Sequence, residues 1–102
     1  MILRLMKVQL LSFAGCPNVE SARRALRRAL ETLHLDVPFE EVDVRSVDTP
    51  AHLRAWGSPT ILVNGVDVAG GIPSGDCCRL YPSSEFRGAP AVALIEDALR
   101  RG

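Results

Sequence analysis

Three cysteines, Cys16, Cys77 and Cys78, are the residues of this sequence best suited to chemistry. A thiolate attacks disulfides and binds soft metal ions, so a reactive cysteine suits either redox exchange or metal capture. Three cysteines are too few to form a disulfide framework for a chain of 102 residues, and their odd number leaves one sulfur without an internal disulfide partner. At least one thiol is therefore expected to be free, bound to a ligand or bonded to another chain.

Cys16 is expected where a strand gives way to a helix. Residues 7–13 form a short segment that is apolar at both odd and even positions at its centre, as in a strand covered on both faces. Pro17 suits a first helical position, and apolar residues recur at three-and-four spacing as far as Leu33. We therefore place Cys16 at the N-cap or in the first turn, where unpaired backbone N–H groups and the helix dipole favour a thiolate.

Further patterns predict the remaining elements in the order βαβ-α-ββα. The predicted segments are a strand, a short helix, two hairpin strands and a last helix, over residues 39–44, 50–56, 60–63, 66–69 and 90–101. Asn64-Gly65 predicts a tight hairpin, because both central turn residues must tolerate positive φ. Residues 70–88, which contain Cys77 and Cys78, show no periodicity. An aperiodic stretch of that length in a small domain is either functional or mobile.

This order of elements resembles the thioredoxin superfamily over nearly the whole chain. Two motifs carry the resemblance, Phe13-Ala14-Gly15-Cys16-Pro17 and Trp56-Gly57-Ser58-Pro59-Thr60. The later Val63-Asn64-Gly65 with Gly70-Gly71 is similar to the glutaredoxin version of the hairpin. The resemblance implies an α/β chain with one thioredoxin-like domain over residues 1–102, built on a four-stranded mixed sheet with helices on both faces.

A narrower resemblance rests on four short motifs. Gly-Cys-Pro-Asn, Gly-Ser-Pro-Thr, Cys-Arg-Leu-Tyr and Gly-Ala-Pro, in this order, are similar to a family of small bacterial thioredoxin-like chains sometimes labelled alkylmercury lyases. A shared label for a fold does not supply a catalytic site. The resemblance nevertheless keeps mercury among the ligands to consider.

The superfamily resemblance implies that Cys16 is the nucleophile of a monothiol thiol–disulfide oxidoreductase. In the resembled fold the proline that matches Pro59 is cis, lies beside the cysteine and leaves the preceding backbone free to bind an extended thiol substrate. We therefore expect Pro17, Ser58, Pro59 and Thr60 to bind the substrate. That substrate would be a thiol or disulfide of a protein or of glutathione, and no resident cofactor or metal is expected.

The chain departs from dithiol members of the superfamily, because Val19 replaces the second thiol of Cys-x-x-Cys. Cys77 or Cys78 could act as a remote resolving thiol. Glutathione could resolve Cys16 instead, although Phe13 stands where monothiol glutaredoxins place a basic residue.

Two alternatives need no redox turnover. The three thiolates could bind a soft ion such as Hg(II), Cu(I) or Zn(II), although adjacent cysteines suit a closed zinc site poorly. The chain could also be a non-catalytic interaction module that has kept the fold.

Composition and charge narrow the function classes. Twelve Lys and Arg against twelve Asp and Glu give no net charge, which disfavours a nucleic-acid binder that depends on counterion release. No segment approaches the length of a membrane-spanning helix. The apolar start before Cys16 is a poor lipoprotein signal, because it is short and interrupted by Arg4 and Lys7. We expect a cytoplasmic protein without nucleic-acid or membrane partners, with Met6 as an alternative start.

Overall fold

The computed structural model describes residues 6–73, 75, 78–81 and 88–102. Cys77 lies outside this part, as do residues 1–5, on which the signal and start-site expectations depend. The described residues form seven elements in the predicted order: β1 (Val8–Ser12), α1 (Val19–Thr32), β2 (Phe39–Asp43), α2 (Ala51–Arg54), β3 (Thr60–Val63), β4 (Val66–Asp67) and α3 (Val92–Arg101).

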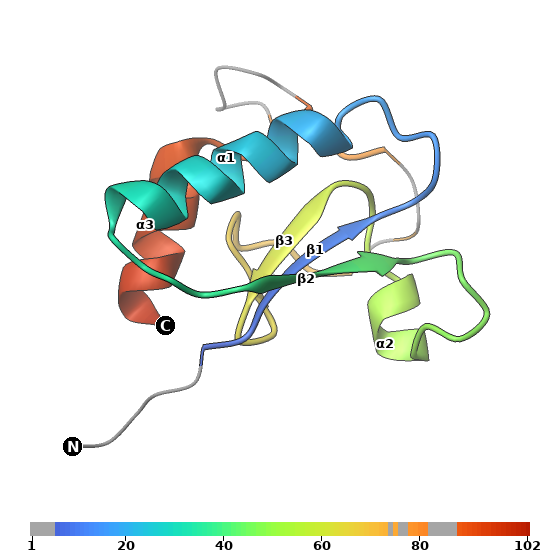
Figure 1. The fold of residues 1–102 in the computed structure, drawn as a ribbon. Coiled ribbons are helices and arrows are strands. Elements are labelled where there is room, and N and C mark those ends of the chain that lie inside the picture. The colour runs from blue at the N-terminus through green and yellow to red at the C-terminus, as the bar shows by residue number, and fades with distance from the viewer. Residues whose placement is uncertain (1–5, 74, 76–77, 82–87) are drawn as a thin grey trace.

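The four strands form one mixed sheet in the order β2-β1-β3-β4. β1 pairs in parallel with β2 and antiparallel with β3, and β3 pairs antiparallel with β4. Leu11 near the end of β1 lies opposite Thr60 at the start of β3. The segment that leaves β1 and the segment that enters β3 therefore meet at the same end of the sheet (Figure 1).

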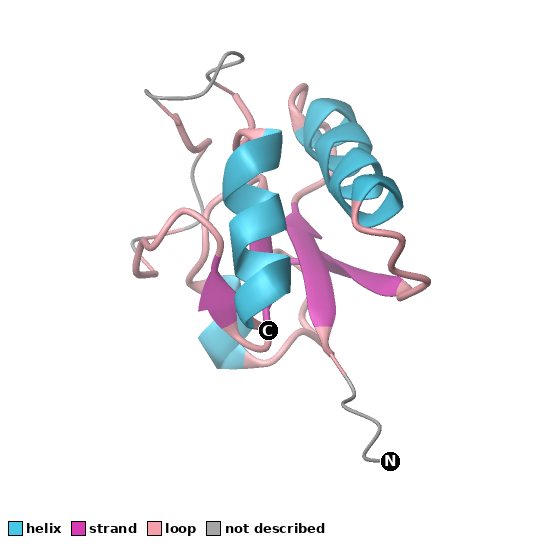
Figure 2. Ribbon diagram, turned by 90° about the vertical axis from the view of Figure 1, so that its left-hand side faces the viewer, coloured by secondary structure: helices cyan, strands magenta, loops and turns pink. Residues whose placement is uncertain are grey.

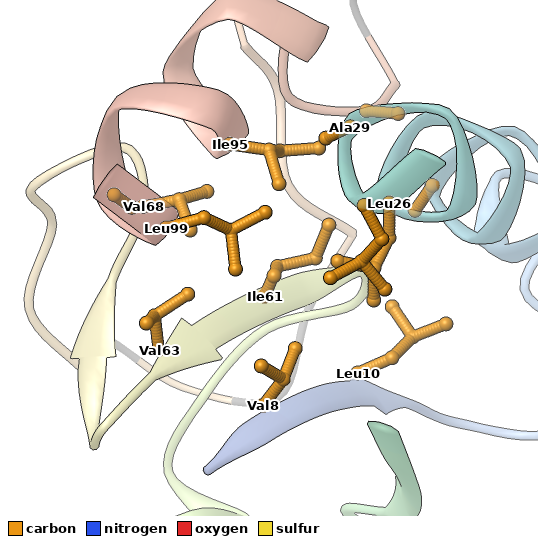
Figure 3. Close-up of a cluster of buried hydrophobic side chains, with 13 residues drawn as sticks. Val8, Leu10, Leu26, Ala29, Ile61, Val63, Val68, Ile95 and Leu99 are labelled. Atoms are coloured by element: carbon orange, nitrogen blue, oxygen red, sulfur yellow. The ribbon is translucent and has the colours of Figure 1, made fainter. Parts of the chain in front are cut away.

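One face of the sheet carries the larger hydrophobic core. Alternate residues of β1 and β3 point toward α1 and α3, so that Leu10 and Ile61 pack with Leu26, Ile95 and other apolar side chains (Figure 3). Each of these four residues is fully buried. Both helices lie on this face (Figure 2), as the apolar spacing along their sequences requires.

The opposite face of the sheet holds a second core. The intervening strand residues Leu11 and Leu62 pack there with Leu53 of α2 and with Trp56. Figure 1 shows α2 on this side, below the sheet, with α1 above it. Helices thus cover both faces, as expected. No helix in the described part of the chain is long and apolar enough to cross a bilayer.

Candidate functional site

Cys16 lies in the turn that links β1 to α1. Gly15 has a φ of +83°, and the Cys16 N–H donates to the Phe13 carbonyl at 3.2 Å. α1 begins at Val19 with Asn18 as its N-cap. The prediction that Cys16 and Pro17 occupy the N-cap or first helical position is therefore wrong, because the turn uses these residues before the helix begins. The helix dipole acts mainly on its first turn, so it contributes less to this sulfur than the sequence suggested.

Cys16 is also well covered by its neighbours. The residue is 6% exposed and belongs to the second core. The buried side chains of this cluster are apolar and come from β1, β3, the loop after β2 and the α2 region: Leu11, Phe13, Val44, Leu53, Trp56 and Leu62. A thiol this covered offers little surface to a bulky reagent. A reaction partner of the Cys16 thiol must therefore be a small molecule, a molecule that opens the turn, or another side chain of this protein.

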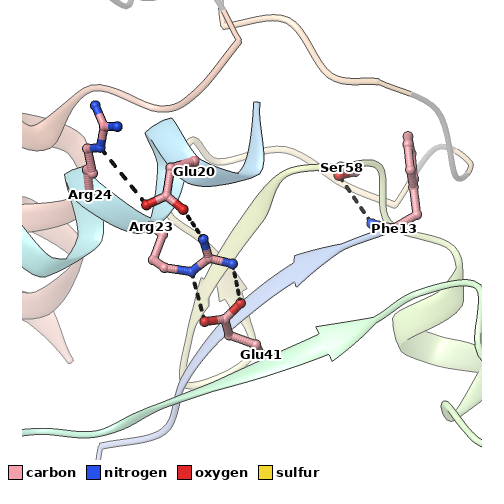
Figure 4. Close-up of polar contacts among 6 residues, drawn as sticks. All are labelled: Phe13, Glu20, Arg23, Arg24, Glu41 and Ser58. Atoms are coloured by element: carbon pink, nitrogen blue, oxygen red, sulfur yellow. Dashed lines mark hydrogen bonds and ion pairs between the residues drawn. The ribbon is translucent and has the colours of Figure 1, made fainter. Parts of the chain in front are cut away.

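The Ser58–Pro59 segment lies directly beside this turn. The Ser58–Pro59 peptide bond is cis, as expected. The Ser58 hydroxyl oxygen accepts from the Phe13 N–H at 3.4 Å (Figure 4). Phe13 therefore links the two motifs, since its carbonyl accepts from Cys16 and its amide donates to Ser58. The Thr60 hydroxyl is buried and donates to the Gly57 carbonyl at 2.7 Å.

The exposed Cys78 lies opposite Ser58. The two residues form a parallel β-bridge, and the Arg79 N–H donates to the Ser58 carbonyl at 2.9 Å. Both Cys16 and Cys78 are free thiols. The backbone of Ser58, expected to be open to a substrate, is thus paired with the chain's own segment. Pro17 stays exposed beside Cys16.

The Arg79 side chain anchors this segment. Its guanidinium donates to the Thr60 hydroxyl and to the Asp67 carboxylate, each at 3.0 Å. The Asp67 side chain is 0% exposed and also accepts from the Ala69 and Gly71 N–H groups at 3.3 and 2.9 Å. A buried carboxylate is tolerated when it is both paired and hydrogen-bonded. This pair therefore ties the segment after Cys78 to the end of the hairpin.

Tyr81 provides a second anchor. Its hydroxyl donates to the Pro59 carbonyl, and the Arg79 guanidinium lies 4.7 Å from its ring centroid. Burial raises the pKa of Tyr81 to about 12, since a charged phenolate would lose its hydration. The tyrosine therefore stays a neutral hydrogen-bond donor over the physiological range.

Sequence reasoning missed Arg79, Asp67 and Tyr81 as parts of the site. The available signal was Asp67, a carboxylate between Val66 and Val68 in a predicted strand. Nothing in the aperiodic stretch after the hairpin indicated which residue would pair with it.

An open groove of about 310 Å³ borders the turn on its other side. Its walls include Phe13 and the β2 carboxylates Glu41 and Asp43. Glu41 is held by the Arg23 guanidinium at 2.7 and 2.9 Å, which lowers the pKa of that carboxyl (Figure 4). Arg45 stacks on the Phe13 ring, 3.8 Å from its centroid. A cation thus lies next to Phe13, but it comes from the loop after β2.

The described residues bring together no group of three or more His, Cys, Asp or Glu side chains that could hold a metal ion. The three-thiolate alternative also requires Cys77, which lies outside them. Comparison with known proteins adds no relative, because no family model, curated protein or solved structure matches this chain.

Proposed function

We propose that this chain is a thioredoxin-like thiol–disulfide oxidoreductase in which Cys16 is the nucleophile. The main support is that the Cys16 turn lies beside the cis Ser58–Pro59 bond. The backbone of Phe13 joins the two segments by hydrogen bonds. The element order and the central β1–β3 pair, with helices on both faces, support the thioredoxin-like fold. The wider resemblance of the sequence motifs points the same way.

The chemistry begins with the Cys16 thiolate. It attacks one sulfur of a substrate disulfide, forming a mixed disulfide and releasing the other sulfur as a thiolate. A second thiolate must then attack the mixed disulfide to free the rest of the substrate. The substrate class is a thiol or disulfide of a small molecule or a protein. The cover over Cys16 favours a substrate whose disulfide is accessible.

Disulfide turnover by active-site variants tests this function. The assay follows the reduction of a fluorogenic disulfide by dithiothreitol at catalytic protein concentrations. We expect Cys16→Ser to lose the protein-dependent rate. His52→Ala, a change of an exposed α2 residue, should keep it. If Cys16→Ser turns over at the wild-type rate, the proposal is wrong, and soft-metal capture or a non-catalytic interaction role becomes the function to test.

A further inference from the structure

We propose that residues 78–81 are a built-in occupant of the Ser58–Pro59 edge, presenting Cys78 to Cys16 as its second sulfur with Arg79 as the positioning residue. This inference rests on the proposed function and deepens it. It selects Cys78 over Cys77 and over an external thiol, and it assigns a role to an ion pair that the sequence did not reveal.

The backbone of Ser58 is paired with the segment that carries Cys78. Cys78 is its bridge partner, and the next N–H, that of Arg79, donates to the Ser58 carbonyl. Extended peptides bind sheet edges through the same kind of main-chain pairing. The segment therefore lies as an extended ligand would lie, with a cysteine at the paired position.

The side chains of Arg79 and Tyr81 hold this backbone pairing in place. Arg79 reaches Thr60 and the fully buried Asp67, and Tyr81 reaches the Pro59 carbonyl. These contacts fix the segment on the two residues that follow Ser58. A planar guanidinium can satisfy two acceptors at once with little further loss of freedom. The anchors therefore keep Cys78 close to Ser58, which raises its local concentration there.

Ser58 links the two cysteines through its hydrogen bonds and its backbone pairing. On one side its hydroxyl accepts from Phe13, whose carbonyl holds the Cys16 amide. On the other side its backbone pairs with Cys78. Cys16 is 6% exposed, whereas Cys78 is exposed. Both cysteines are thus linked to the same residue, and a tethered second thiol favours an intramolecular second step because its effective concentration is high.

The reaction balances with a disulfide R–S–S–R′ as oxidant. The Cys16 thiolate attacks one sulfur and releases R′S⁻, leaving Cys16–S–S–R. The Cys78 thiolate attacks the Cys16 sulfur, forms the Cys16–Cys78 bond and releases RS⁻. The substrate gains two electrons and becomes two thiolates, while the two protein thiols lose their protons and two electrons. An external dithiol then reduces the protein disulfide.

Stoichiometry with an aromatic disulfide reagent tests the pairing. In a Cys77→Ser background, one reagent molecule per chain should release two coloured thiolates, and the rate of the second release should be independent of protein concentration. Cys78→Ser in that background should release one, since the mixed disulfide cannot resolve. Peptide mapping of the oxidised wild-type chain should find the Cys16–Cys78 bond. A Cys16–Cys77 or Cys77–Cys78 bond instead would overturn the assignment, even with turnover intact. Failure of the proposed function would be seen separately, as disulfide turnover by Cys16→Ser at the wild-type rate.

The equilibrium between the protein disulfide and glutathione tests the positioning role of Arg79. Arg79→Met should lower the equilibrium constant for forming Cys16–Cys78 by about tenfold, which raises the reduction potential by about 30 mV. Arg79→Lys should recover part of the loss, because an ammonium can pair with Asp67 but lacks the fork that also reaches Thr60. Arg100→Met, which breaks an exposed pair on α3, should leave the constant unchanged.

The role of Arg79 is distinguished by its effects on stability and on the glutathione equilibrium. If Arg79→Met lowers the unfolding free energy and leaves the glutathione equilibrium at the wild-type value, Arg79 supports the fold and does not position Cys78. If Arg79→Met fails to fold, Tyr81→Phe removes the hydroxyl that donates to Pro59 and keeps the ring and the Arg79–Asp67 pair. This variant should then lower the same constant, and an unchanged constant would overturn the proposal.

Discussion

Removing Arg79 from the Arg79–Asp67 pair should strongly destabilise the fold, because the carboxylate left behind is fully buried. The guanidinium and carboxylate are 3.0 Å apart, with the Asp67 side chain 0% and the Arg79 side chain 19% exposed. Removing one partner of a buried pair costs about 3–5 kcal/mol, since the other charge stays desolvated. Asp67 would keep two backbone N–H donors, which places Arg79→Met at the lower end, about 3 kcal/mol.

Urea unfolding of a double-mutant cycle measures this value at neutral pH. Arg79→Met, Asp67→Asn and the double variant should give a coupling energy of about 2 kcal/mol, as expected for residues in contact. The control Arg100→Met breaks an exposed pair of 3.2 Å on α3 and should cost under about 1 kcal/mol. A coupling energy near zero, or equal losses for Arg79→Met and Arg100→Met, would refute the reasoning.

Further expectations concern ionisation, a turn and the core. Tyr81 is the single tyrosine, and its pKa is raised to about 12. Its stabilising contribution is therefore full below its ordinary pKa of 10 and lost as pH rises toward 12. Tyrosinate absorbance should appear only well above pH 10, and Tyr81→Phe should reduce the loss of stability at alkaline pH. Arg23 lowers the pKa of Glu41 from 4.5, so their pair stabilises above that pH and weakens as the pH falls; Arg23→Met should reduce the acid sensitivity of the urea midpoint. Gly65→Ala should cost about 1–2 kcal/mol by thermal or urea unfolding, because φ is +82° and nothing else opposes a Cβ there. Leu26→Ala, at a fully buried core position, should cost about 2–5 kcal/mol in the same measurement.

The hairpin was readable from the sequence because its signal is local. Asn64 and Gly65 have φ values of +53° and +82°, as the turn between two β-branched runs required. The element order followed from apolar periodicity and from glycine and proline positions, which act over a few residues. The strands that surround the site were therefore predictable from these local signals, whereas the placement of Pro59 beside the Cys16 turn was expected only from the superfamily resemblance.

The details of the site depend on interactions that periodicity does not encode. The apolar pattern of α1 could not show that Gly15 would close a separate turn and leave Cys16 before the helix. The Arg79–Asp67 pair joins an aperiodic segment to the hairpin, 12 residues away in sequence. Asp67 needs this partner because its carboxylate is fully buried. That burial results from the packing of β4 against its neighbours, which the sequence pattern does not encode.

For the proposed disulfide exchange, the occupied Ser58 edge also affects which substrates are favoured. A substrate peptide that paired with Ser58 would displace the Arg79 N–H and pull the guanidinium away from Thr60 and Asp67. Hydrogen bonds to charged groups contribute about 1.5–3 kcal/mol each, so losing both side-chain bonds costs about 3 kcal/mol or more. A small disulfide that reaches Cys16 without using this edge avoids that cost. The same pair that presents Cys78 should therefore bias the protein toward small or locally accessible disulfides and against extended peptides.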